Sequence, residues 1–141
     1  MDLRKTTMNL YRFHERLDNG LVICRFQDAT VEEHEMLIIS GVDINRGRVY
    51  TPLEYAIRQA CHNSSSDNLK KVGVFLRYGA SLKSRPRHSA AKDLIEFAKL
   101  NGNQIPYNFI QKVLVLKTLV MIGDKLRIPK DLIRVLSKFL F

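Results

Sequence analysis

The sequence predicts an all-α fold: a short, irregular helical solenoid of about three helix pairs, closed by a C-terminal helix. Two observations support this. Apolar residues recur at helical spacing, and three segments share an ending in which a glycine directly follows the last apolar residue of the pattern. Segments with a common ending indicate repeated units, which a solenoid stacks along one axis. We therefore expect one domain over residues 1–141.

The shared endings lie at Gly41, Gly79 and Gly123. The residue just after a helix often adopts positive φ, which glycine tolerates without steric cost, so we expect each glycine to end a helix. Polar and apolar residues alternate briefly after each glycine. This alternation predicts a short extended hairpin between one unit and the next.

The clearest unit begins at Thr51 and Pro52. Threonine is a good N-cap, and proline suits the first helical turn because its missing N–H would be unpaired there. The following apolar residues share one helical face, namely Leu53, Ala56, Ile57 and Ala60. A second helix over about residues 68–78 turns another apolar set inward, namely Leu69, Val72, Phe75 and Leu76.

This unit resembles an ankyrin repeat. The family's Thr-Pro-Leu-His-x-Ala appears as Thr-Pro-Leu-Glu-Tyr-Ala at 51–56, and its Leu-Leu-x-x-Gly-Ala-Asp as Phe-Leu-Arg-Tyr-Gly-Ala-Ser at 75–81. Residues 37–45 resemble the end of the preceding repeat, whose first helix we expect within residues 7–19. A third unit takes its first helix from residues 85–103. The resemblance extends over residues 7–125 and implies protein binding without chemistry.

One family position differs. Glu54 stands where ankyrin repeats carry a histidine that hydrogen-bonds between repeats. A polar turn at residues 61–68 also makes the unit longer than the family period of about 33 residues.

The segment 126–141 predicts a C-terminal helix with two interpretations. It caps the end of the stack, or it docks on another protein. Its Ile-Pro-x-x-Leu pattern resembles the F-box-like tail of poxvirus-type ankyrin proteins and the end of a SOCS box, and both families dock on cullin-type ubiquitin ligases. The residues that carry this resemblance are Leu126, Ile128, Pro129, Leu132 and Leu136.

No pattern of catalytic or metal-binding residues stands out. The four histidines (His14, His34, His62 and His88) and two cysteines are scattered, without zinc-ligand spacing. The sequence also lacks a phosphate-binding loop and a nucleophile motif. We expect no enzyme activity, no metal and no cofactor.

The composition, 45% hydrophobic and 26% charged, is typical of a globular domain. Lys117 interrupts the apolar run at 113–123, so we expect no segment long enough to cross a membrane and no membrane partner. The N-terminus lacks the apolar stretch of a secretory signal, and two cysteines make no disulfide framework. We expect an intracellular protein, cytoplasmic, with the nucleus as the alternative.

The net charge is +9, and the positive excess lies in the C-terminal half. Basic and aromatic residues stand where the two hairpins should project, namely Arg46, Arg48, Tyr50, Arg85, Arg87 and His88. Arginine and tyrosine are frequent in interface hot spots, so we expect these residues to bind a protein with an acidic surface. The resemblance to viral and intracellular-pathogen ankyrin proteins implies a host partner. The alternatives are a ligase adaptor acting through the C-terminal helix, and nucleic-acid binding through the basic half.

Overall fold

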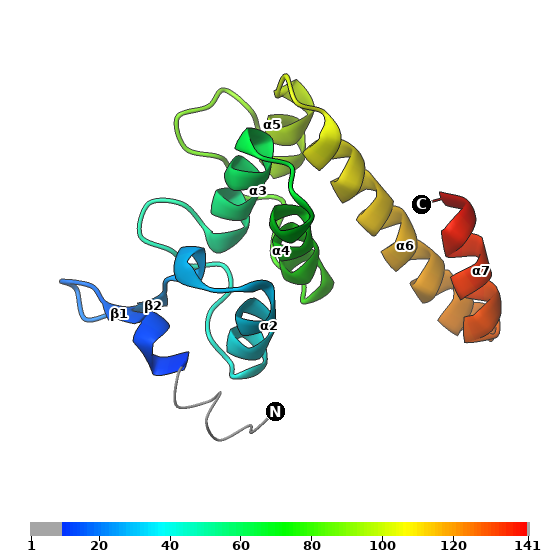
Figure 1. Ribbon diagram of the computed structural model, residues 1–141, viewed down its shortest axis with the longest axis horizontal. Helices are drawn as coiled ribbons and strands as arrows, with labels where there is room; N and C mark the ends of the chain where they lie inside the picture. The colour runs from blue at the N-terminus through cyan, green and yellow to red at the C-terminus, as the bar shows by residue number, and fades with distance from the viewer. Residues whose placement is uncertain (1–9, 141) are drawn as a thin grey trace.

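The computed structural model describes residues 10–140, apart from the side chains of Leu136, Ser137, Phe139 and Leu140. Most of these residues are helical, as expected (Figure 1). The α-helices of this part of the chain are α2 (Val31–Ile39), α3 (Pro52–His62), α4 (Ser66–Arg77), α5 (Leu94–Leu100), α6 (Ile105–Leu126) and α7 (Lys130–Leu140).

The helices pack in two rows. One row contains α2, α4 and α6, each in contact with the next, and the other contains α3 and α5. Within a unit, α3 packs on α4 and α5 packs on α6. The core lies between the rows and is centred on Phe75, Leu37, Ile57 and Leu94, which are fully buried. The predicted apolar face of α3, Leu53, Ala56, Ile57 and Ala60, is buried in this core, as are Val72, Phe75 and Leu76 of α4.

The helix starts are encoded locally. Thr30, Thr51, Ser65 and Asp93 cap α2, α3, α4 and α5, and each accepts a hydrogen bond from the backbone N–H three residues later. Pro52 occupies the first turn of α3, and Pro106 that of α6. The start predicted from Thr51-Pro52 is confirmed.

Two of the three predicted helix ends are confirmed. Gly41 and Gly79 have φ of 99° and 86° and follow α2 and α4. The prediction for Gly123 was wrong, because this glycine lies inside α6, where a Cβ would overlap the Ile133 side chain on α7. Arg127 ends α6 instead, with φ 56°, and the Ile128 N–H bonds to the Gly123 carbonyl at 2.8 Å.

The N-terminal segment is not the predicted helix. A 3₁₀ turn, η1 (Tyr11–Phe13), leads into strand β1 (His14–Arg16), which pairs antiparallel with β2 (Val22–Cys24), and η2 (Phe26–Asp28) follows. The turn between the strands contains Asn19-Gly20, and Gly20 has φ 86°. Asn-Gly is a strong hairpin signal, which explains why this segment does not continue as a helix. Residues 7–9 of the predicted helix lie outside the described part.

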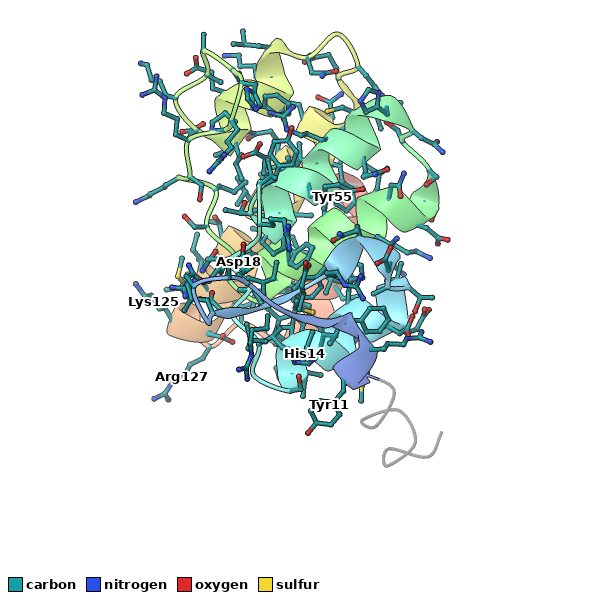
Figure 2. The ribbon with its side chains drawn as sticks, turned by 90° about the vertical axis from the view of Figure 1, so that its left-hand side faces the viewer. Tyr11, His14, Asp18, Tyr55, Lys125 and Arg127 are labelled. Carbon is teal, nitrogen blue, oxygen red and sulfur yellow. The ribbon has the colours of Figure 1, made fainter. Side chains whose placement is uncertain are left out.

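The first loop (42–50) and the second loop (80–92) contain no strand, and both are fully described, so the predicted extended hairpins were wrong. Each loop nevertheless contains the same kind of turn, in which a side-chain oxygen accepts from the backbone N–H two residues later. The Asn45 N–H donates to Asp43 Oδ1, and the Lys83 N–H donates to Ser81 Oγ. Asn45 Oδ1 then accepts from the Ser81 N–H at 3.0 Å, which joins the two loops. Figure 2 looks onto the side where the loops project beside the β1–β2 hairpin, which carries Asp18.

Both helices of the third unit differ from the prediction. Its first helix, α5, begins only at Leu94, so Ala90 and Ala91 lie in the second loop. Its second helix, α6, extends past the end of α4, and α7 lies against this extension (Figure 1). Lys117 on α6 donates from Nζ to the Leu76 carbonyl at 2.8 Å, near the C-terminal end of α4. A lysine suits this position because the end of a helix carries partial negative charge.

Helix α6 is also long and apolar enough to cross a membrane by length and composition, contrary to the sequence-based expectation. The run of 113–123 continues on both sides of Lys117 within one helix of 22 residues. Length and composition do not separate a span from a core helix, and the N-terminal half of α6 buries Pro106 and Ile110 in the protein core.

Candidate binding groove

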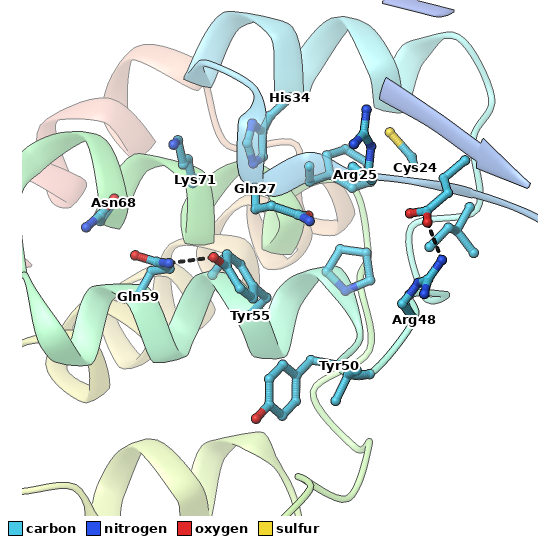
Figure 3. Close-up of a pocket in the computed structure, with 17 residues that line it drawn as sticks. Cys24, Arg25, Gln27, His34, Arg48, Tyr50, Tyr55, Gln59, Asn68 and Lys71 are labelled. Atoms are coloured by element: carbon cyan, nitrogen blue, oxygen red, sulfur yellow. Dashed lines mark hydrogen bonds and ion pairs between the residues drawn. The ribbon is translucent and has the colours of Figure 1, made fainter. Parts of the chain in front are cut away.

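An open groove of about 320 Å³ lies between the N-terminal segment, the first loop and helices α3 and α4 (Figure 3). Its lining combines apolar groups near the core with polar groups at the rim. Phe26 and Ala56 are buried at its base, where Phe26 stacks edge-on against Phe75 with ring centroids 4.9 Å apart. The base of the groove is therefore part of the protein core.

Polar side chains from α3 and α4 form one part of the rim (Figure 3). Tyr55 and Gln59 lie one helical turn apart on α3, and Gln59 Nε2 donates to the Tyr55 hydroxyl at 2.7 Å. Asn68 and Lys71 contribute from α4, and Gln27 contributes from η2. None of these residues was predicted from the sequence, and the prediction for α3 covered only its buried face. The signal was present, since Tyr55 and Gln59 lie off that face at i, i+4 spacing.

Charged side chains form the other part of the rim. Arg48 from the first loop makes an ion pair with Glu15 on β1, and Arg25 lies close by. The Arg25 guanidinium donates to the Arg12 carbonyl through Nη2, whereas its Nε is buried and has no partner in the described structure. Burial raises the pKa of the neighbouring Cys24 to about 12, so this thiol stays protonated at neutral pH.

His34 of α2 lines the groove from within the core. Its side chain is 3% exposed, and its ring lies 5.3 Å from both Phe26 and Phe75. Its Nδ1 is 2.7 Å from the Thr30 carbonyl, so the tautomer that donates from Nδ1 fits this site. Burial lowers the pKa of His34 to about 4, and the nearby charge of Lys71 acts in the same direction. His34 is therefore neutral at pH 7.

A buried network beneath the second loop positions the neighbouring units. Glu54 of α3 is 2% exposed and accepts from Arg58 Nε at 3.0 Å. It also accepts from the backbone N–H of Arg87 at 3.3 Å, and Arg58 donates to the Arg87 carbonyl. The Arg58 guanidinium stacks between the rings of Tyr50 and Phe97, 4.5 and 4.6 Å from their centroids. Glu54 thus links adjacent units, although it replaces the histidine that the ankyrin pattern has there.

A second link joins the turns on the far side of the units. Asn103, between α5 and α6, donates to the Cys61 carbonyl at 3.2 Å and to Ser64 Oγ at 2.7 Å. Both acceptors belong to the turn region between α3 and α4, so the equivalent turns of two units are hydrogen-bonded to each other. Hydrogen bonds therefore link adjacent units at both ends of their helices, through Glu54 at one end and Asn103 at the other.

The structure brings only some of the predicted partner-binding residues together. Arg48 and Tyr50 line the groove. The others, Arg46, Arg85, Arg87 and His88, are exposed on the two loops outside it, and Arg46 pairs with Asp43 at 3.5 Å. His88 has a positive φ of 55°.

The predicted docking residues lie at the corner between α6 and α7. Leu126 and Leu132 are 67% and 49% exposed, Pro129 is exposed and Ile128 is half-buried. The side chain of Leu136 lies outside the described residues. Ile133, which follows Leu132 in the chain, is buried against Gly123. The corner therefore exposes two of the large apolar side chains that the docking hypothesis requires.

Within residues 10–140, no group of three or more histidine, cysteine, aspartate or glutamate side chains is arranged to hold a metal ion. Comparisons with protein-family models, with curated proteins and with solved structures found no match.

Proposed function

We propose that this chain is a non-enzymatic interaction module, with ankyrin-like units, that binds an intracellular protein through the groove and the adjoining loops. The observation that carries this proposal is the groove itself. It is open, its base is part of the core, and it combines an apolar centre with a polar rim, as protein interfaces do.

Several features support the ankyrin-like description. Paired helices stack in two rows, Thr51-Pro52 starts a first helix, and Gly41 and Gly79 end second helices. The first loop lines the groove, the two loops project on the same side of the ribbon (Figure 1), and both contain the same kind of turn. In such an arrangement the loops and first helices present a continuous binding face, and its exposed arginines favour an acidic partner.

A matched pair of variants tests the proposal. Gln59→Arg places a long side chain in the groove, whereas Asn108→Arg makes the same kind of change on the exposed surface of α6. Proteins captured from cell lysate by the wild type are identified by mass spectrometry, and their affinities are measured by calorimetry. We expect Gln59→Arg to weaken binding by about tenfold or more and Asn108→Arg to leave it unchanged. Equal binding by all three proteins would exclude the groove.

The exposed corner of α6 and α7 favours a second candidate function, an adaptor that docks on a cullin-type ubiquitin ligase. Leu126 and Leu132 would supply the apolar contacts. We expect the wild type to co-purify with a cullin complex and the double variant Leu126→Asp, Leu132→Asp to lose it with little change in melting temperature, because both side chains are exposed. If the double variant retains the complex, or if the wild type never captures one, the adaptor hypothesis fails. Nucleic-acid binding through the basic half stays a prediction.

A further inference from the structure

The part of the groove between α3 and α4 holds hydrogen-bond donors that nothing within the described structure uses. The Lys71 ammonium makes no hydrogen bond or ion pair with any described residue. The Tyr55 hydroxyl accepts from Gln59, so its own proton is free to be donated to a ligand. Gln27 adds an exposed side-chain amide beside them. A lysine ammonium, a hydroxyl and an amide are the donors that bind a carboxylate group.

The charge of the groove also favours a carboxylate ligand. Among the described residues three cations line it, Arg25, Arg48 and Lys71, and the one carboxylate of this lining, Glu15, is paired with Arg48. Arg25 lies 4.0 Å from Asp28, which is outside the lining, so Lys71 is the cation without a carboxylate partner in the described structure. His34 carries no charge at neutral pH, because burial lowers its pKa to about 4. Lys71 is half-buried in the groove, and no carboxylate of the described lining balances its charge. A charge-assisted hydrogen bond is stronger at such a partly dry site than on the open surface.

We infer that the groove binds an extended segment of the partner by an aspartate or glutamate side chain, whose carboxylate is held by Lys71 and Tyr55. This inference rests on the proposed function and specifies the chemistry of the partner. The groove is open to solvent, so a bound segment can continue beyond it, and Phe26 and Ala56 at its base offer apolar contacts to the side chains next to the acidic one.

The probe is an array of N-acetylated, C-terminally amidated decapeptides. Their flanking positions are randomised, and one central position is fixed as Asp, Glu, Asn or Gln. The wild-type protein should bind the Asp or Glu set about tenfold more tightly than the matched amide set at moderate ionic strength. Lys71→Met should remove this preference, and Lys71→Arg should retain most of it. Lys70→Met is the matched control, because Lys70 is the adjacent exposed lysine and does not line the groove.

Melting temperatures check that every variant is folded before its binding is compared. Binding of the wild type without a preference for acidic peptides would overturn the inference and leave the proposed function standing. A preference that Lys71→Met keeps, or that Lys70→Met loses equally, would also overturn it. If neither the acidic nor the amide peptides bind the wild type at all, the inference fails, and the comparison of Gln59→Arg with Asn108→Arg decides the proposed function separately.

Discussion

Replacing Glu54 with alanine is expected to lower the free energy of unfolding by about 3 kcal/mol, because it removes one partner of a buried ion pair. Glu54 is 2% exposed and is the acceptor for Arg58 and for the backbone N–H of Arg87. Without the carboxylate, the Arg58 guanidinium stays between two aromatic rings with one of its N–H groups unpaired, and the second loop loses an attachment to α3. The loss is measured by urea unfolding at pH 7.

Two further variants separate the network from a general effect of removing a carboxylate. Glu54→Gln keeps an acceptor oxygen but loses the charge, so we expect an intermediate loss of about 1–2 kcal/mol. Glu32→Ala removes an exposed carboxylate from the first turn of α2 and should cost no more than about 1 kcal/mol. If Glu54→Ala costs no more than Glu32→Ala, the network does not stabilise the fold.

Acidification from pH 7 to pH 4 is expected to destabilise the protein by about 3 kcal/mol through His34 alone. The pKa of His34 is lowered to about 4 in the folded protein, against an unfolded value of 6.5. Between these two values the unfolded chain binds a proton that the folded chain does not, so stability falls as the pH falls through this window. One pKa unit corresponds to about 1.4 kcal/mol, which gives the size of the effect.

The measurement compares the wild type with His34→Gln by urea unfolding at several pH values. Glutamine can donate to the Thr30 carbonyl but does not titrate, and every other group that titrates in this range is common to both proteins. We expect the wild type to lose about 3 kcal/mol more than the variant between pH 7 and pH 4. Parallel pH profiles would contradict the buried, neutral state of His34, even if the variant is less stable at every pH.

The predictions that succeeded concern short stretches of chain. Thr51-Pro52 encodes a helix start because the cap hydrogen bond joins residues three apart. Gly41 and Gly79 encode helix ends because positive φ is a property of a single residue. The apolar face of α3 follows from helical periodicity, and its members are buried as a set.

The predictions that failed depended on contacts between distant segments. Gly123 carries the same local signal as Gly79, yet it serves a close approach to Ile133 on α7, and Arg127 ends the helix despite its positive φ. Residues 7–19 were assigned a helix to complete a repeat, whereas the Asn19-Gly20 turn and the pairing of β1 with β2 form a hairpin. Glu54 was treated as a departure from a pattern, because nothing in the sequence shows that it reaches Arg87.

The amino-acid sequence by itself determined the helical class, the helix start at Thr51-Pro52, two helix ends and the inward face of the central unit, because these depend on interactions within a few residues. Only the tertiary structure decided the groove, the burial of His34 and Glu54, and the position of Lys71 in the groove without a partner among the described residues. Each of these features forms where segments of different units pack against one another. The free energy of this packing depends on shape complementarity and desolvation between distant residues, and a single stretch of sequence does not encode it.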